Sequence, residues 1–591
     1  MKTGLCRWAA LCLAAVALLA GCAGAPALPA APSPAPTAQT EQQRFDALCE
    51  ELFRDMVGGD AITLHYTLAD PAAYGITPPP PSLGYLWADG DRFSDRAAPH
   101  LLRRLRAFDA AQLDGESACT LSVLLWYCEH TVALAGYDLY YDPVSPLFGV
   151  QSQLPVMLVE YTLRTPQDVE DYLALLEDMP RYFGLAAQVA GQRAEAGLFM
   201  SDHTLDKVLQ QARAFLTPPE ENYMVTTFPA RIEAVEGLTG AERQAYAGRN
   251  LEAVAGPVYQ AYAQLLDALE ALRGSGRNEG GLAGLPAGRQ YYELLAQAAV
   301  GTDRTVPQMQ QTLQSMAAGS LARMRRLAAA DEGLAGRYER YQPAAASPDE
   351  MLQDLKEKMA GDFPALEGAA YVLKTVDPAL QQTLSPAFYM VPPLDDYENN
   401  TIYINPASAG RDLYPTLAHE GWPGHLYQSV YFRAQQPSPL RGALGFSGYD
   451  EGWATYVELE YAYAYSGRDE ALAAFSAANE AAALALYGLV DIGVNYDGWG
   501  REQTAAFVEE YFGGQPGLAD WLFDVVVEEP ADYLKYAVGY AEFLGLRVQA
   551  QEALGAAYDP AAFHAFVLGG GPMPFPVLQG RLNEWLAGQT F

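Results

Sequence analysis

The strongest constraint on the fold is a pair of histidines, His419 and His425, that lie six residues apart. Glu420 follows the first histidine directly, and the sequence Gly-Trp-Pro-Gly separates this pair from the second. Six residues of regular helix turn the chain by roughly 240° net, so the two imidazoles would point to different sides. Pro removes a helical hydrogen bond, and Gly tolerates unusual backbone angles. We therefore expect the helix that begins near Asp412 to be distorted between Glu420 and His425, and regular again by about Tyr427.

With two residues looped out, both imidazoles can reach one metal ion. In the zincin pattern HExxH, two histidines four residues apart share a helix face, bind zinc, and have the intervening Glu as general base. Here His419 and Glu420 would take those first two roles, and His425 would be the second ligand. Trp422 would then lie beside the metal and either line a pocket or fill the core. The alternative is a set of ordinary core or surface histidines, since one such match arises by chance in roughly one chain in a hundred.

A third ligand is available 26 residues after His425, in the segment Tyr-Asp-Glu-Gly-Trp-Ala-Thr-Tyr-Val-Glu. Glu451 would complete a set of two His and one Glu, which is common in catalytic zinc sites. Glu458 lies two helical turns further on the same face, where it could hydrogen-bond a ligand histidine. The other interpretation of Glu458 is a solvated charge on a helix surface.

The balance of charge excludes some classes of partner. The chain has 37 Lys and Arg against 72 Asp and Glu, a formal net charge of −35. Phosphate backbones and anionic lipid surfaces both attract basic proteins, so we expect no nucleic-acid binding and no electrostatic adhesion to membranes.

The N-terminus has the composition of an export signal. A short basic start is followed by an apolar run of about 12 residues, too short to span a bilayer, which ends in Leu-Ala-Gly-Cys at Cys22. This ending resembles the lipobox of bacterial lipoproteins, in which the Cys is lipidated; the alternative is an ordinary signal peptide with an incidental Cys. Residues 23–40 are rich in Pro and Ala and predict an extended tether. We expect a lipid-anchored protein on the extracytoplasmic face of a bacterial membrane.

Three cysteines follow the tether, and none belongs to a CxxC pair that would suggest a metal cluster. Cys119 and Cys128 form the only pair close in sequence, so they are either a local disulfide or buried thiols.

The body of the chain reads as mainly helical. Thr165 is a plausible N-cap before Pro166, and Val169, Leu173 and Leu176 then share one helical face. The clearest strands are residues 387–391 and 401–404, which are short, β-branched and aromatic and are separated by turn residues. We expect them to form a small antiparallel hairpin or sheet next to the metal-binding helix.

The expected organisation has three parts. Residues 1–21 form the lipoprotein signal peptide, and residues 22–40 form the lipidated Cys with its tether. Residues 41–591 form one helical domain, with an N-terminal part over about 41–360 and a catalytic part over about 361–591.

The sequences HEGWPGH and EGWATY resemble the HE-x-x-PGH and EGWA-x-Y patterns of the bacterial "domain of unknown function 885" family, which is grouped with the gluzincin metallopeptidases. The resemblance extends over roughly residues 45–590, with weaker similarity in segments such as Leu285–Gly288 and Tyr536–Gly539. It implies a helical body with a gluzincin-like core, one zinc ion per chain, and peptidase activity. Family members often carry His where this chain has Asn495, so any role of that His is in doubt here.

Three other residues have open roles. Tyr536 fits the family pattern, and its hydroxyl could donate to the oxyanion of a tetrahedral intermediate, although packing is the default for one of 37 Tyr residues. Arg547 could pair with a substrate carboxylate or with one of the many acidic side chains. His564 is equally compatible with a structural or a functional role.

These observations predict a zinc-dependent metallopeptidase of short peptides. Zinc would be bound by His419, His425 and Glu451, Glu420 would deprotonate the attacking water and protonate the leaving amine, and Tyr536 would support the oxyanion. Residues 401–404 could hold the substrate backbone by strand addition. The alternatives are a zinc hydrolase of a non-peptide amide or a cell-wall peptide, and a surface binding protein with a relict metal site. The sequence leaves open the substrate, endo- against exopeptidase action, and the oligomeric state.

Overall fold

The computed structural model describes residues 39–86, 97–343, 346–378, 380–381, 384–408, 410, 412–513 and 515–589. The predicted signal peptide and Cys22 lie outside these residues. The first helix, α1, begins at Glu41, where Thr40 and Gln43 form a reciprocal capping box. The fold is mainly helical, as the sequence predicts.

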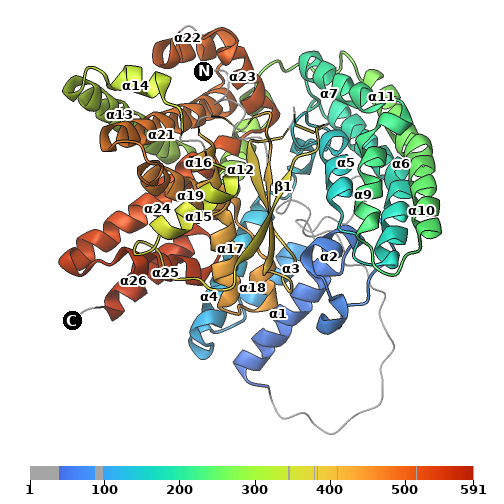
Figure 1. Ribbon diagram of the computed structural model, residues 1–591, viewed down its shortest axis with the longest axis horizontal. Coiled ribbons are helices and arrows are strands. Elements are labelled where there is room, and N and C mark those ends of the chain that lie inside the picture. Colours follow the sequence, from blue (N-terminus) through green and yellow to red (C-terminus); the bar gives the residue numbers. More distant parts are fainter. Residues whose placement is uncertain are drawn as a thin grey trace.

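In the first half of the chain, helices α5 to α11 surround a core of their own, whereas α4 also contributes to the largest core cluster of the molecule. The bounds of the helices in this half are α1 (Glu41–Val57), α2 (Ala61–Thr67), α3 (Ala98–Leu105), α4 (Gly115–Ala133), α5 (Val150–Glu160), α6 (Pro166–Glu195), α7 (Asp202–Phe215), α8 (Tyr223–Thr226), α9 (Phe228–Glu233), α10 (Gly240–Ala253) and α11 (Tyr259–Glu270). Helices α5 to α11 gather on one side of the molecule in Figure 1.

The helix α6 confirms the local prediction. Thr165 is its N-cap, accepts a hydrogen bond from the backbone of Asp168, and is followed by Pro166 at the first helical position. The predicted apolar face of α6 is buried in the core of the first half.

The second half forms the other helical group, with the strands between the two groups in Figure 1. Its helices are α12 (Gly288–Val300), α13 (Val306–Ala330), α14 (Leu334–Arg340), α15 (Pro348–Lys358), α16 (Leu413–Glu420), α17 (His425–Ala434), α18 (Pro439–Ala443), α19 (Ser447–Val457), α20 (Tyr463–Tyr465), α21 (Glu470–Ile492), α22 (Arg501–Phe512), α23 (Leu518–Glu528), α24 (Asp532–Leu554), α25 (Pro560–Gly570) and α26 (Phe575–Gly588).

Among the residues that the structure describes, one helical stretch, Glu470–Asp497, is long and apolar enough to cross a membrane by length and composition alone. However, 78% of its most apolar window is buried inside the fold. It packs against α13 and α24 in the largest core cluster, so its apolar character is explained by its central position.

The sheet has three strands in the order β1-β3-β2, with β1 (Ala370–Thr375), β2 (Ala387–Met390) and β3 (Asn399–Ile404). The predicted hairpin is confirmed, because β2 pairs with β3 in antiparallel register. β1 was not predicted from the sequence; it pairs with β3 in parallel and makes the sheet mixed. The proposed strand addition at residues 401–404 is wrong, since β3 is the central strand and both of its edges are already paired.

Candidate metal centre

The predicted interruption of the helix is confirmed. α16 ends at Glu420, and α17 begins at His425. Between them the chain forms a short loop, in which the amide of Gly424 donates to the carbonyl of Ala418 at 2.9 Å. The amide of Tyr427 still donates across this loop, to the carbonyl of Gly421 at 3.1 Å, and helical bonding has resumed at Gln428, whose amide donates to the carbonyl of Gly424 at 2.9 Å.

Gly424 is required at this loop by close approach of the backbone. A Cβ atom at Gly424 would lie 1.8 Å from the carbonyl oxygen of His419, a distance that no side chain can occupy. A Cβ at Gly421 would lie 2.6 Å from a methyl group of Leu352 on α15. The two glycines therefore allow α17 to restart directly against the end of α16, so that His425 turns back toward His419.

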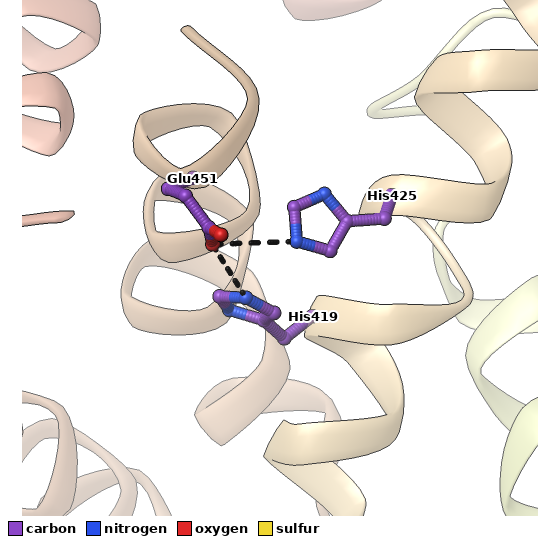
Figure 2. Close-up of side chains that lie close together, drawn as sticks. All are labelled: His419, His425 and Glu451. Carbon is purple, nitrogen blue, oxygen red and sulfur yellow. Dashed lines mark ion pairs between the residues drawn. The ribbon is translucent and has the colours of Figure 1, made fainter. Parts of the chain in front are cut away.

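The loop brings the two histidines and Glu451 together, as Figure 2 shows. The Nε2 atoms of His419 and His425 each lie 3.4 Å from Oε2 of Glu451, and one potential ligand atom from each residue lies within 4.8 Å of the other two. Ligands of a tetrahedral zinc ion, at about 2.0–2.2 Å from the metal, are separated by roughly 3.4 Å. This group of buried side chains can therefore bind a metal ion.

Glu451 lies on α19, and Glu458 follows directly after the end of this helix. Oε2 of Glu458 is 3.3 Å from Nδ1 of His419, so the ring lies between two carboxylates. Burial lowers the pKa of His419, but hydrogen bonding to Glu451 and Glu458 outweighs burial and raises it to about 10. Burial raises the pKa of Glu451, but the two imidazoles and the charge of Lys535 hold it well below its usual range.

Glu420 lies at the last position of α16 and reaches the sheet. Its Oε2 accepts a hydrogen bond from the amide of Tyr389 on β2 at 3.0 Å. Burial raises the pKa of Glu420, while the two neighbouring imidazoles and the Tyr389 amide lower it, and the net shift is upward. A carboxylate with a raised pKa beside a metal site is suited to accept a proton from water near neutral pH.

Tyr536 lies on α24, and its ring centroid is 6.5 Å from that of His419. It is 3% exposed. α24 packs closely on α19, the helix that carries Glu451, so the two helices together define one wall of the site.

Two charged residues near the site were missed by the sequence analysis. Lys535 is 5% exposed, pairs with Oδ1 of Asp532 at 2.6 Å, and contributes to the lowered pKa of Glu451. Asp450 is next to Glu451, and burial raises its pKa to about 7, while the charge of His425 lowers it. The sequence signal for Lys535 was its position in the apolar segment Tyr533–Tyr540, directly before Tyr536.

Trp422 is buried in the core. It is 1% exposed, belongs to the largest core cluster, and packs at 5.5 Å from Tyr427 between ring centroids. The side chain therefore fills the core beneath the loop.

Arg547 and His564 belong to one hydrogen-bonded network, which the Tyr456 hydroxyl links. Arg547 pairs with Glu460 at 2.5 Å. The two ring nitrogens of His564 lie 2.9 Å from the hydroxyl of Tyr456 and 2.6 Å from the carbonyl of Asp362, and the ring stacks on Phe363. These contacts give both residues structural roles.

Asn495 likewise holds the fold together. It is fully buried, accepts a hydrogen bond from the amide of Leu282, and donates to Asp491 and to the carbonyl of Val526.

Of the two interpretations of Cys119 and Cys128, a disulfide or buried thiols, the structure shows buried free thiols. They lie nine residues apart on α4, which places them on opposite faces of the helix.

Solved structures share this fold over most of the chain. A proposed lipoprotein from Colwellia psychrerythraea is 21% identical, covers 93% of this chain and 100% of its own, and has a TM-score of 0.80. A proposed lipoprotein of unknown function from Shewanella oneidensis is 15% identical, covers 92% of this chain and 99% of its own, and has a TM-score of 0.61. A proposed oligoendopeptidase F from Bacillus anthracis is 11% identical over 83% of this chain and 96% of its own, with a TM-score of 0.29, which is too low to indicate a shared fold.

No curated protein matches the sequence. Residues 83–582 match the family described as "Bacterial protein of unknown function (DUF885)". This range covers most of the chain and includes both metal-site segments, the interrupted helix and α19. The chain therefore belongs to the DUF885 family.

Proposed function

We propose that this protein is a zinc-dependent peptidase that is anchored by lipid at the extracytoplasmic face of the membrane. The observation that carries the proposal is the convergence of two His and one Glu on one point beside a separate glutamate, Glu420. Bound zinc would supply a Lewis acid for the substrate carbonyl and would lower the pKa of a water molecule. The donor set fits zinc, because two imidazoles and one carboxylate at this spacing are a common catalytic zinc set.

The other residues of the site have defined tasks in this proposal. Glu420, oriented by the Tyr389 amide, takes the proton from the attacking water and passes it to the leaving amine. Glu458 orients His419 from the opposite side of its ring. Tyr536 donates its hydroxyl to the oxyanion. The substrate chain lies near β2, because β2 is the edge strand whose backbone contacts Glu420.

Access to the site favours short substrates. The side chains of His419, His425 and Glu451 are 8%, 14% and 5% exposed. A folded protein cannot bring its backbone to a centre that is so enclosed, whereas a short flexible peptide can. We therefore include short peptides in the proposal.

The membrane location rests on the lipobox at Cys22 and on the relatives. Two proteins of the same fold are themselves described as proposed lipoproteins. A lipid anchor followed by the tether of residues 23–40 would hold the folded body close to the membrane surface.

The test of the peptidase proposal is a digest of a mixed peptide library, with mass-spectrometric detection of new termini. Wild-type protein should cleave peptides, and a zinc chelator should abolish cleavage. Glu420→Gln should retain zinc but lose several orders of magnitude in kcat, because the base is removed while the ligands remain. His203→Ala, which changes an exposed histidine on α7, serves as the matched control.

The alternatives predict different results. A hydrolase of cell-wall peptides or non-peptide amides would leave the library intact but cleave those substrates with the same dependence on Glu420. A binding protein with a relict site would cleave none of them, and that result would refute the catalytic proposal.

A further inference from the structure

A cavity of about 120 Å³ lies between α4, α17, α18, α25 and α26. Its lining includes Phe432, near the end of α17, whereas the metal ligand His425 is the first residue of the same helix. The cavity is thus separate from the metal centre. Its volume is enough for several water molecules, or for one small polyatomic ion.

Arg441 on α18 forms one wall of this cavity and is 2% exposed. Its Nη1 donates to the carbonyl of Pro572 at 2.7 Å, and its Nη2 donates to the carbonyl of Gly570 at 2.8 Å. These bonds use two of the five N–H donors of the guanidinium group. Both acceptors are neutral, so they leave the positive charge uncompensated.

Among the described residues, two other arginines are buried, Arg193 and Arg468. Each has a carboxylate oxygen within 3.1 Å. In the part of the chain that the structure describes, no carboxylate lies within ion-pair distance of Arg441. Burial of a guanidinium ion without a counter-charge is unfavourable, and removal from water lowers the pKa of Arg441.

A second guanidinium group faces the same cavity. Arg581 on α26 lines it, and its Nη1 lies 3.5 Å from Sγ of Cys119. A Cβ at Gly570 would be 3.2 Å from the same Nη1, so this guanidinium group lies near the residue whose carbonyl accepts from Arg441. Among the described residues, Arg581 also has no carboxylate partner. The two like charges therefore converge on one small cavity in a chain whose net charge is strongly negative.

Glu116 is the one carboxylate among the residues that line the cavity. It lies in the first turn of α4, is exposed to solvent, and is beyond ion-pair distance from both arginines. Its charge acts on Arg441 only from a distance, as a minor effect that raises the pKa against the larger lowering by burial.

We propose that this cavity binds a small oxyanion between Arg441 and Arg581. The planar guanidinium fork matches the oxygen spacing of phosphate, sulfate and carboxylate groups, and an anion would relieve the repulsion between the two charges. The occupant is either an inorganic oxyanion or the carboxylate of a small organic acid, since both present the same oxygens. This inference does not depend on the metal centre or on catalysis.

The experiment titrates the full-length protein with inorganic phosphate, sulfate or acetate at constant ionic strength, with chloride as the reference salt. Binding is followed by calorimetry and by protection of Cys119 from iodoacetamide, which is read by peptide mass spectrometry. Cys49 and Cys128 are internal references, because burial raises the pKa of each thiol to about 12 and slows their reaction. We expect saturable binding and protection of Cys119. Preference for phosphate and sulfate would identify an inorganic occupant, and preference for acetate would identify a carboxylate.

Variants that remove single charges test whether oxyanion binding depends on the charged residues that line the cavity. Arg581→Gln should weaken binding at least tenfold, while Arg326→Gln, which removes an exposed arginine on α13, should leave it unchanged. Glu116→Gln should preserve or tighten binding, because it removes a negative charge from the rim. The proposal is overturned if no oxyanion binds more tightly than chloride, or if Arg581→Gln binds as well as wild type. Weaker binding in Glu116→Gln would likewise overturn it, because that result would indicate a cation site.

Discussion

The backbone of Gly539 on α24 lies so close to Gly452 on α19 that a Cβ on Gly452 would be 2.6 Å from the carbonyl carbon of Gly539. Gly452 directly follows Glu451, and Gly539 lies one helical turn after Tyr536. The two glycines therefore set the spacing between Glu451, a proposed metal ligand, and the tyrosine proposed for the oxyanion.

Gly452→Ala should destabilise the protein by about 1–3 kcal/mol, because the added methyl group forces the two helices apart. It should also weaken metal binding, since Glu451 moves with α19. Thermal unfolding and metal content of the purified variant measure both effects. Gly545→Ala on α24, the helix that packs against α19, is the control, because a Cβ there meets nothing within 4 Å and Ala favours helix. Equal stability of Gly452→Ala and wild type would show that α19 and α24 can move apart without loss of stability.

The parts of the site that sequence alone predicted are those defined by local spacing. The interrupted helix follows from two histidines six residues apart with Pro and two Gly between them. The β2–β3 hairpin follows from two short strands around a turn. In both cases the physical constraint acts over a few residues, so it can be recognised in the sequence.

The parts that sequence could not predict depend on contacts between distant segments. β1 joins the sheet in parallel with β3, and parallel pairing leaves no turn signal between neighbouring strands. Trp422 was as compatible with a pocket as with the core, and only the packing of Tyr427 and the surrounding cluster decides this. Lys535 matters to the site because its charge lowers the pKa of Glu451, a residue that is far away in the sequence.

Glu458→Gln tests the carboxylate behind His419. The neutral amide is a weaker partner for Nδ1 than the carboxylate, which lies 3.3 Å away. We expect zinc affinity to fall by about 10- to 100-fold while the fold is retained. Competition with a chromogenic chelator measures the affinity, and Glu510→Gln on the surface of α22 is the control. Unchanged affinity would assign Glu458 a packing role.

Tyr536→Phe separates the hydroxyl from the ring. The ring packs near His419, so the variant should fold and bind zinc as wild type does. If the hydroxyl donates to the oxyanion, kcat on a cleaved peptide should fall by about 10²–10³ with little change in KM. Tyr511→Phe, at a position that is 41% exposed, should have normal kinetics. A wild-type kcat in Tyr536→Phe would exclude the hydroxyl from the reaction.

Cys22→Ser tests the anchor. The predicted lipobox places the acylated thiol at Cys22, and Ser lacks that thiol. Metabolic labelling with a fatty-acid analogue should be lost, and the protein should move from the membrane fraction to the soluble fraction. Cys49→Ser, which changes a buried thiol of the folded body, should retain the label. Persistent labelling of Cys22→Ser would rule out this cysteine as the lipidation site.

Asp491 should make stability depend on pH. It is fully buried at the end of α21 and accepts hydrogen bonds from the Tyr292 hydroxyl, the Asn495 amide and the backbone of Ala531. Burial raises its pKa to about 7, against an ordinary value of about 3.9, and the hydrogen bonds only partly oppose this shift.

Between these two values the folded protein retains a proton that the unfolded chain releases. The stabilisation is therefore complete below about pH 4 and is lost as the pH rises toward 7, with a slope of at most about 1.4 kcal/mol per pH unit. Asp491→Asn cannot titrate, so the difference in stability between wild type and this variant should shift against wild type over that interval. Denaturant unfolding at pH 4.5, 5.5, 6.5 and 7.5 measures it, with Asp497→Asn as the exposed control. A difference that is constant with pH would mean that Asp491 is ionised in the fold at all these values.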